Sequence, residues 1–244
     1  MTHTAAPSPT VVLVHGAFAD ASGYAGIILE LEEAGITTLS PPNPLRGLSV
    51  DAEAVKAFVA AIDGPVVLVG HSYGGAVITQ AAVDLDNVAA LVYLAAFALD
   101  EGESAAELQE PFPPSLLATN ARPSSYPAAG AAGGPDLFIA LDGFRETFCA
   151  DVPIATATVM AATQRPVAAA CLGEKCTGAA WKSKPSWYLV SEHDNAISPD
   201  AERFMAERIN ATTETINGSH TAFIAQPVAT AAFILKAVAH VRAG

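Results

Sequence analysis

A serine with closely spaced glycines marks the stretch of the chain that is best suited to chemistry, since residues 70–75 read Gly-His-Ser-Tyr-Gly-Gly. An apolar run precedes this stretch, and we expect a helix to begin at about Tyr73. A Gly-x-Ser-x-Gly sequence between a strand and a helix is typical of a nucleophile elbow, a tight turn that exposes a serine hydroxyl. Ser72 is therefore the candidate nucleophile. The Tyr73 backbone N–H, at the start of the helix, is a candidate donor to an oxyanion.

A serine hydroxyl needs a base to accept its proton, and a histidine usually serves. Six histidines are present. Only His220, in the sequence Asn-Gly-Ser-His-Thr after the last predicted strand, has the late position that the chain order serine, acid, histidine requires. His71 lies inside the turn, where we expect it to pack or to orient its neighbours.

The acid that orients such a histidine should follow a strand upstream of it. The loop at residues 191–195 reads Ser-Glu-His-Asp-Asn and follows an apolar run. Asp194 is the preferred candidate, because it precedes Ile197 and a predicted helix and can point back over the sheet. Asp100 and Glu101, which follow an earlier strand, are the alternative.

The first predicted strand is followed by His-Gly-Ala-Phe at residues 15–18. Gly16 permits a turn, so that the Ala17 N–H can face Ser72 as the second oxyanion donor. Phe18 is the best candidate for an aromatic side chain that lines the substrate pocket.

Short apolar runs alternate with helical segments along most of the chain, which predicts βαβ units and a mostly parallel sheet. The predicted strands cover residues 10–15, 36–39, 66–69, 88–95, 187–190 and 212–216. The predicted helices cover residues 22–34, 49–62, 199–209 and 227–240, besides the one from Tyr73. We expect Ser49 and Ser198 to cap two of these helices.

The alternation stops between about residues 99 and 181, where prolines are frequent and no buried strand is evident. Short helices are expected near residues 104–109 and 136–148. We interpret the segment as a cap or lid on one domain that covers residues 1–244, because structureless loops of this length are uncommon. The alternative is a disordered linker between two domains.

Composition restricts the classes of function. Hydrophobic residues make up 51% of the 244 residues and charged residues 15%, so the chain can bury a large core and is neither disordered nor fibrous. A net charge of −13 disfavours nucleic acids and anionic membranes as partners.

We find no signal peptide and no membrane-spanning segment, and we expect a cytoplasmic protein. Its three cysteines are expected to be reduced thiols, although Cys171 and Cys176 are close enough to pair in an oxidising compartment. We expect no metal and no cofactor, since the chain has neither zinc-ligand spacing nor a phosphate-binding loop.

Five motifs, spread over the whole chain, resemble those of the α/β-hydrolases: VLVHGAF (12–18), VGHSYGG (69–75), LVYLAAF (91–97), SEHDNAISP (191–199) and GSH (218–220). The chain is similar to a compact branch that includes plant methyl-salicylate-type esterases, hydroxynitrile lyases and bacterial relatives. The resemblance implies a mostly parallel central sheet with helices on both faces and a small cap after the fourth strand.

The same resemblance implies a catalytic triad of Ser72, Asp194 and His220, with an oxyanion hole made by the Ala17 and Tyr73 amides. The expected reaction is hydrolysis of a small, largely apolar carboxylic ester or lactone through an acyl-enzyme. The lyases of this branch carry a lysine directly after the histidine, whereas this chain has Thr221, which disfavours cyanohydrin cleavage. Same-fold dehalogenases and epoxide hydrolases use an aspartate nucleophile, so Ser72 argues against both.

Two alternatives stay open. One is a non-hydrolytic enzyme of the same fold, either a cofactor-free perhydrolase (haloperoxidase) or a carbon–carbon lyase. The other is a small-molecule receptor with a vestigial triad. The choice between monomer and homodimer is also open.

Overall fold

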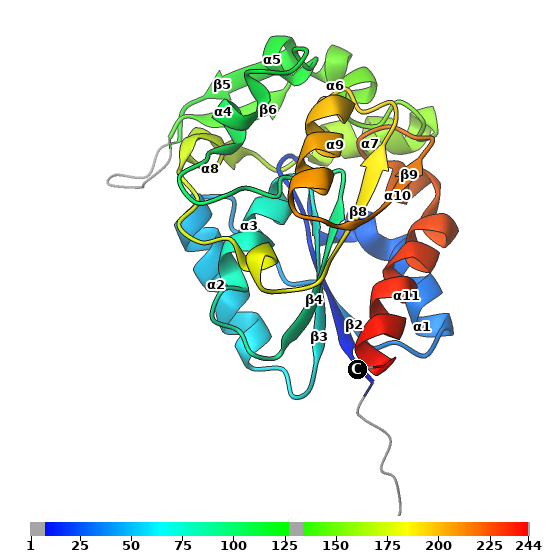
Figure 1. Cartoon of the computed structure of the whole chain (residues 1–244). Helices are drawn as coiled ribbons and strands as arrows, with labels where there is room; N and C mark the ends of the chain where they lie inside the picture. Colours follow the sequence, from blue (N-terminus) through cyan, green and yellow to red (C-terminus); the bar gives the residue numbers. More distant parts are fainter. Residues whose placement is uncertain (1–7, 127–133, 244) are drawn as a thin grey trace, which may run out of the picture.

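The computed structural model describes residues 8–126 and 134–243, and these ranges are built around one six-stranded sheet (Figure 1). The strand order is β2-β1-β3-β4-β8-β9, and all of the pairs are parallel. The strands are β1 (Thr10–Val14), β2 (Thr38–Leu39), β3 (Val66–His71), β4 (Val88–Leu94), β8 (Ser186–Ser191) and β9 (Thr212–Ile216). The predicted mostly parallel sheet is confirmed.

The central strands of the sheet are buried on both faces, which explains why β1, β3 and β4 are nearly continuous apolar runs. In β1, Val12 and Val14 belong to one core cluster, whereas Val11 and Leu13 belong to the other. The first cluster includes α2 (Leu48–Ala60), α3 (Tyr73–Ala81) and α9 (Pro199–Arg208). The second includes α1 (Ala25–Glu33) and α11 (Pro227–Ala243). Short helical turns complete this part of the chain: η1 (Ala21–Tyr24), η2 (Ala180–Lys182) and α10 (Ala222–Ala225).

The chain between β4 and β8 carries elements of its own above the carboxyl ends of the strands (Figure 1). They are α4 (Ala105–Gln109), α5 (Leu117–Asn120), β5 (Ala121–Ser124), β6 (Asp136–Ile139), α6 (Leu141–Phe148), α7 (Ile154–Thr163), β7 (Val167–Ala168) and α8 (Ala169–Gly173). Three of them form a small antiparallel sheet in the order β5-β6-β7. Most of the Gly/Ala-rich stretch at residues 128–134 lies outside the described residues.

Two predictions for this segment were wrong. A helix was expected over residues 136–148, but residues 136–139 form β6, and only residues 141–148 are helical. No strand was expected here, yet three strands are present. They are two to four residues long, which is too short to show a periodic pattern in the sequence. Their pairing depends on partners that lie far away along the chain.

Both predicted serine caps were also wrong in detail. Helix α2 begins at Leu48, one residue earlier than expected, and the Ser49 hydroxyl donates a hydrogen bond to Glu174 instead. Ser198 does precede α9, but its side chain makes no capping hydrogen bond. The adjacent Pro199 has no N–H and fixes its own φ, which favours a helix start without a side-chain cap.

The three cysteines are separate, buried thiols. The Cys171 thiol contacts the Asp51 carboxylate at 3.6 Å, and the Cys176 thiol donates to the Gly178 carbonyl at 3.2 Å. Within the part of the chain that the structure describes, no helix has the length and apolar character needed to cross a membrane.

Candidate active site

Ser72 occupies a strained turn between β3 and α3, with φ 53° and ψ −125°. A non-glycine residue in this region is rare and needs support from its surroundings. The support comes from glycines that let the surrounding backbone pack closely. A Cβ on Gly70 would lie 2.6 Å from the Gly74 carbonyl oxygen, and a Cβ on Gly74 would lie 2.3 Å from the Val14 carbonyl oxygen. The Phe97 N–H also donates to the Ser72 carbonyl at 3.1 Å. The predicted elbow geometry is therefore present.

His220 and Asp194 form a buried pair, since Nδ1 of the imidazole lies 2.5 Å from Oδ2 of the carboxylate. The other carboxylate oxygen of Asp194, Oδ1, accepts the N–H groups of Ala196 at 2.6 Å and Ile197 at 2.8 Å. The turn after β8 thus fixes the carboxylate through its own backbone. With its Nδ1–H donated to Asp194, the imidazole keeps Nε2 as an acceptor.

The two alternative acids lie elsewhere. Asp100 pairs with Lys182, whose Nζ lies 2.5 Å from Oδ1, and Glu101 lies 3.6 Å from the same amine. The hydrogen bond from Lys182 lowers the pKa of Asp100. In the loop after β8, Glu192 and His193 are exposed, whereas Asp194 is buried.

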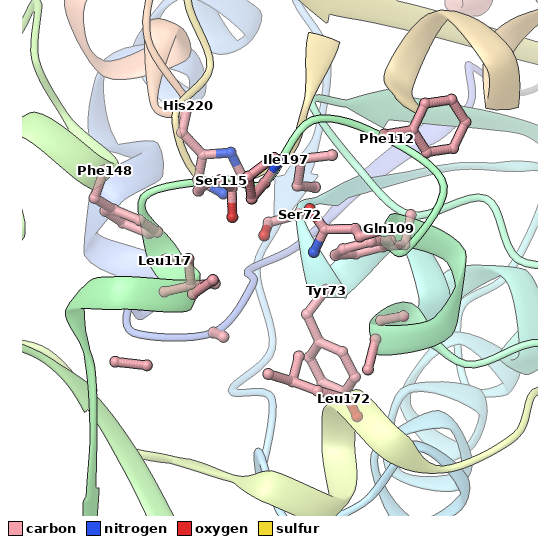
Figure 2. Close-up of a pocket in the computed structure, with 18 of the residues that line it drawn as sticks. Ser72, Tyr73, Gln109, Phe112, Ser115, Leu117, Phe148, Leu172, Ile197 and His220 are labelled. Atoms are coloured by element: carbon pink, nitrogen blue, oxygen red, sulfur yellow. The ribbon is translucent and has the colours of Figure 1, made fainter. Parts of the chain in front are cut away.

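Ser72 and His220 line one cavity (Figure 2). Their side chains do not form a hydrogen bond with one another in this structure. Such bonds are often long in an unliganded site and shorten when a substrate binds. The three side chains that the sequence singled out are thus brought to the same end of the sheet, from the ends of β3, β8 and β9.

Ala17, in the loop after β1, lines this cavity. The His15 ring holds the loop, because its Nε2 accepts the Asn43 N–H at 2.9 Å and its Nδ1 therefore donates to the Gly16 carbonyl, also at 2.9 Å. The Gly16 carbonyl and the Ala17 N–H belong to one trans peptide unit and point in opposite directions. Fixing the carbonyl consequently fixes the N–H. Burial lowers the pKa of His15, which suits this neutral role.

His71 contacts His220 through its backbone carbonyl and its ring, and it does not serve as a base. Its Nε2 donates to the His220 carbonyl at 2.9 Å, and the two ring centroids are 4.6 Å apart. Burial, and to a lesser degree the nearby His220, lowers the pKa of His71 well below its ordinary value. His71 is therefore a neutral donor at physiological pH, in agreement with its expected packing and orienting role.

The cavity has a volume of about 350 Å³ and is mainly apolar. Among the described residues that line it there is no lysine or arginine, and Glu110 is the only carboxylate. Phe18 lies in the wall, as expected, with its ring 6.3 Å from that of Phe148. Figure 2 shows the polar ends of Gln109 and Ser115 directed into the cavity.

Several wall residues were not identified from the sequence. Those from the segment between β4 and β8 include Gln109, Phe112, Ser115, Leu117, Phe148 and Leu172. The predicted helix at residues 104–109 was a partial signal, because it contains Gln109. The others carry no local signal, since they come from short elements whose positions depend on tertiary contacts.

Comparisons with known proteins agree with this geometry. The chain matches the model of the alpha/beta hydrolase family over residues 11–233. It is 28% identical over 229 residues to the alpha/beta hydrolase nvfD of Aspergillus novofumigatus, which covers 85% of this chain and 87% of that protein. It is 25% identical to methylesterase 2 of Arabidopsis thaliana, over 80% of this chain and 81% of that protein. The structure of polyneuridine aldehyde esterase shares its fold, with a TM-score of 0.81, 18% identity and coverage of 94% and 99%. The chain belongs to the alpha/beta hydrolase family.

Proposed function

We propose that this protein is a serine esterase that cleaves small, neutral, largely apolar carboxylic esters or lactones through an acyl-enzyme. The observation that carries the proposal is that Ser72 and His220, whose imidazole is bound to Asp194, line the same apolar cavity. The elbow strain at Ser72 supports it, because strained backbone is concentrated at functional sites. The names of two similar proteins, methylesterase 2 and a carbendazim hydrolyzing esterase of Nocardioides, point to the same class of reaction.

In the proposed first step, the Ser72 oxygen attacks the ester carbonyl carbon while Nε2 of His220 takes the hydroxyl proton. Asp194 holds the imidazole in the required tautomer and stabilises the imidazolium that forms. The negative charge on the former carbonyl oxygen is placed against the Ala17 and Tyr73 N–H groups. Preformed donors of this kind need no reorganisation as the charge develops.

The tetrahedral intermediate then collapses. The bond from the carbonyl carbon to the alkoxy oxygen breaks, and His220 gives its proton to the leaving alcohol. Water attacks the acyl-enzyme with His220 again as the base, and the carboxylic acid leaves with Ser72 regenerated. The cycle requires no cofactor.

The cavity wall supports a neutral substrate. No lysine or arginine stands among its described residues to balance a substrate carboxylate, and Glu110 would repel one. The apolar side chains favour hydrocarbon or aromatic groups, and a volume of about 350 Å³ favours small ones. We further propose that residues of about 99–181 act as a cap on a single domain, because they supply much of this wall.

The test is hydrolysis of p-nitrophenyl esters of increasing acyl length by the wild-type protein, Ser72→Ala and a control, Ser183→Ala, whose serine is exposed and does not line the cavity. We expect turnover with short acyl groups, a fall of about a thousandfold or more in Ser72→Ala, and no change in the control. Turnover that survives in Ser72→Ala would contradict the proposal.

If the wild-type protein is inactive on all of these esters, the alternatives gain support. Peroxide-dependent halogenation with acetate would indicate a perhydrolase, and tight ligand binding without turnover would indicate a receptor. The cytoplasmic location, the absence of nucleic-acid and membrane partners, and the choice between monomer and homodimer stay predictions.

A further inference from the structure

A second carboxyl group lies behind the proposed triad and takes no part in the mechanism described above. Glu202, on α9, is completely buried beside the Asp194 carboxyl, which is among the groups that raise its pKa. One of its oxygens, Oε2, accepts the Ser191 N–H at 3.0 Å. The other, Oε1, is buried and has no hydrogen-bond donor among the described residues.

The acceptor positions of Asp194 are filled differently. Its two oxygens together accept two backbone N–H groups and the His220 imidazole, all at 2.5–2.8 Å. Asp194 therefore has the surroundings of a carboxylate, whereas Glu202 accepts only one N–H. Two ionised carboxylates in buried contact would repel each other strongly. A proton on Oε1 of Glu202 removes the repulsion and turns the unpartnered oxygen into a donor to Asp194.

The charged and titratable groups around the pair are compatible with this arrangement. Burial, followed by the negative charge of Asp194, raises the pKa of Glu202 well above its usual range. Arg203 is exposed and opposes this rise only weakly. The Tyr188 hydroxyl, on β8, donates to the Ala96 carbonyl at 2.5 Å and is not available to neutralise a charge.

The elements on the other side of His220 complete the surroundings. His71, on β3, is a neutral donor to the His220 carbonyl. Asp151 faces the loop from the turn between α6 and α7 and accepts the Ser219 N–H at 3.0 Å. Neither group supplies a positive charge to the Asp194–Glu202 pair.

We infer that Glu202 is a positioning residue, a neutral carboxylic acid that donates a hydrogen bond from Oε1 to the Asp194 carboxylate and so fixes its orientation and limits its basicity toward His220. The inference rests on the proposed function for its catalytic consequence. Part of the negative charge of Asp194 is held by Glu202, so that Asp194 stabilises a protonated His220 less than an isolated carboxylate would.

The test compares Glu202→Gln with Glu202→Met in p-nitrophenyl ester hydrolysis between pH 4.5 and 9. The glutamine amide can donate to Asp194 and accept from Ser191 as a neutral acid does, so we expect kcat within about twofold and an unchanged acid limb of kcat/KM. Methionine fills the space but cannot donate. We expect Glu202→Met to lower kcat by about tenfold with little change in KM and to move the acid limb to higher pH.

Two outcomes would overturn the inference. An acid limb that moves to lower pH by about one unit in Glu202→Gln would show that the wild-type residue is ionised, because the substitution would then have removed a negative charge. Wild-type kcat and an unchanged acid limb in Glu202→Met would show a packing role only. If Glu202→Met does not fold, the glutamine variant and the measurement below decide.

A stability measurement separates this inference from the esterase proposal, because it needs no substrate. In the unfolded chain a glutamate ionises above a pH of about 4.5, whereas the neutral acid that we infer keeps its proton in the folded protein. The wild-type protein should therefore lose stability relative to Glu202→Gln as pH rises from about 4.5 toward 8, in chemical unfolding. A stability difference that stays constant over this range contradicts the neutral acid, whatever the activity results.

Discussion

At the residue scale, the candidate site depends on glycines, because a Cβ atom at these positions would collide with neighbouring atoms. A Cβ on Gly16 would lie 2.7 Å from the Ser72 Cβ and 2.8 Å from the His71 carbonyl oxygen. Neither atom can retreat easily, because both belong to the strained elbow. Gly16 therefore allows the loop after β1 to approach the proposed nucleophile closely, as the proposed role of the Ala17 N–H as an oxyanion donor requires.

Gly16→Ala should consequently displace either Ser72 or the loop by a large fraction of an ångström. A displacement near 1 Å in an active site can lower the rate by about a hundredfold. We expect at least such a fall in kcat/KM for p-nitrophenyl esters, while circular dichroism shows a folded protein. Wild-type turnover in this variant would argue against the proposed contact between the loop and the elbow.

At the scale of elements, the elbow depends on the contacts of α3 with β1 and with the chain that follows β4. Gly74 brings the first turn of α3 against β1, and Gly75 brings it against the chain that follows β4, where a Cβ would lie 2.7 Å from the Phe97 carbonyl oxygen. Because α3 packs this closely against the sheet, its N-terminus can point at the site. The sequence showed the glycines, but the approach distances follow only from the packing.

Gly74→Ala should destabilise this junction, because the new Cβ would lie 2.3 Å from the Val14 carbonyl oxygen, in a rigid strand. Overpacking of this kind costs about 1–3 kcal/mol, and occasionally more. We expect a clearly lower melting temperature in thermal unfolding. The matched control is Gly173→Ala in α8, where a Cβ would meet nothing within 4 Å. Equal melting temperatures for the two variants would contradict the packing argument.

At the scale of the whole molecule, the site is buried deeply enough to keep imidazoles neutral. His15 and His71 are each 1% exposed, and burial lowers the pKa of both. A histidine whose folded-state pKa is depressed takes up its proton more readily in the unfolded chain. Its contribution to stability is complete above the unfolded value, about 6.5, and is lost as pH falls below it.

His71→Gln should remove one such acid-sensitive group, while the amide nitrogen can still donate to the His220 carbonyl. Because the variant lacks the imidazole, we expect its stability relative to the wild type to rise as pH falls from 7 to 5. The slope can reach about 1.4 kcal/mol per pH unit. The matched control is His193→Gln, which makes the same substitution at an exposed side chain. A His71→Gln curve parallel to the wild-type curve would refute the argument.

The sequence by itself determined the parallel sheet and the residues that end its strands. Strands buried on both faces have to be apolar throughout, and a strand-to-helix turn around a serine needs glycines, so both features leave local patterns. Ser72, Asp194 and His220 were identifiable for this reason, as were the Ala17 loop and Phe18. Only the tertiary structure placed Gln109, Ser115 and Leu172 at the cavity, because they belong to short helices and loops between β4 and β8 whose positions depend on tertiary contacts. The same holds for Glu202: its position in α9 looks like that of an ordinary helical acid, and only the packing of α9 on β8 buries it against Asp194.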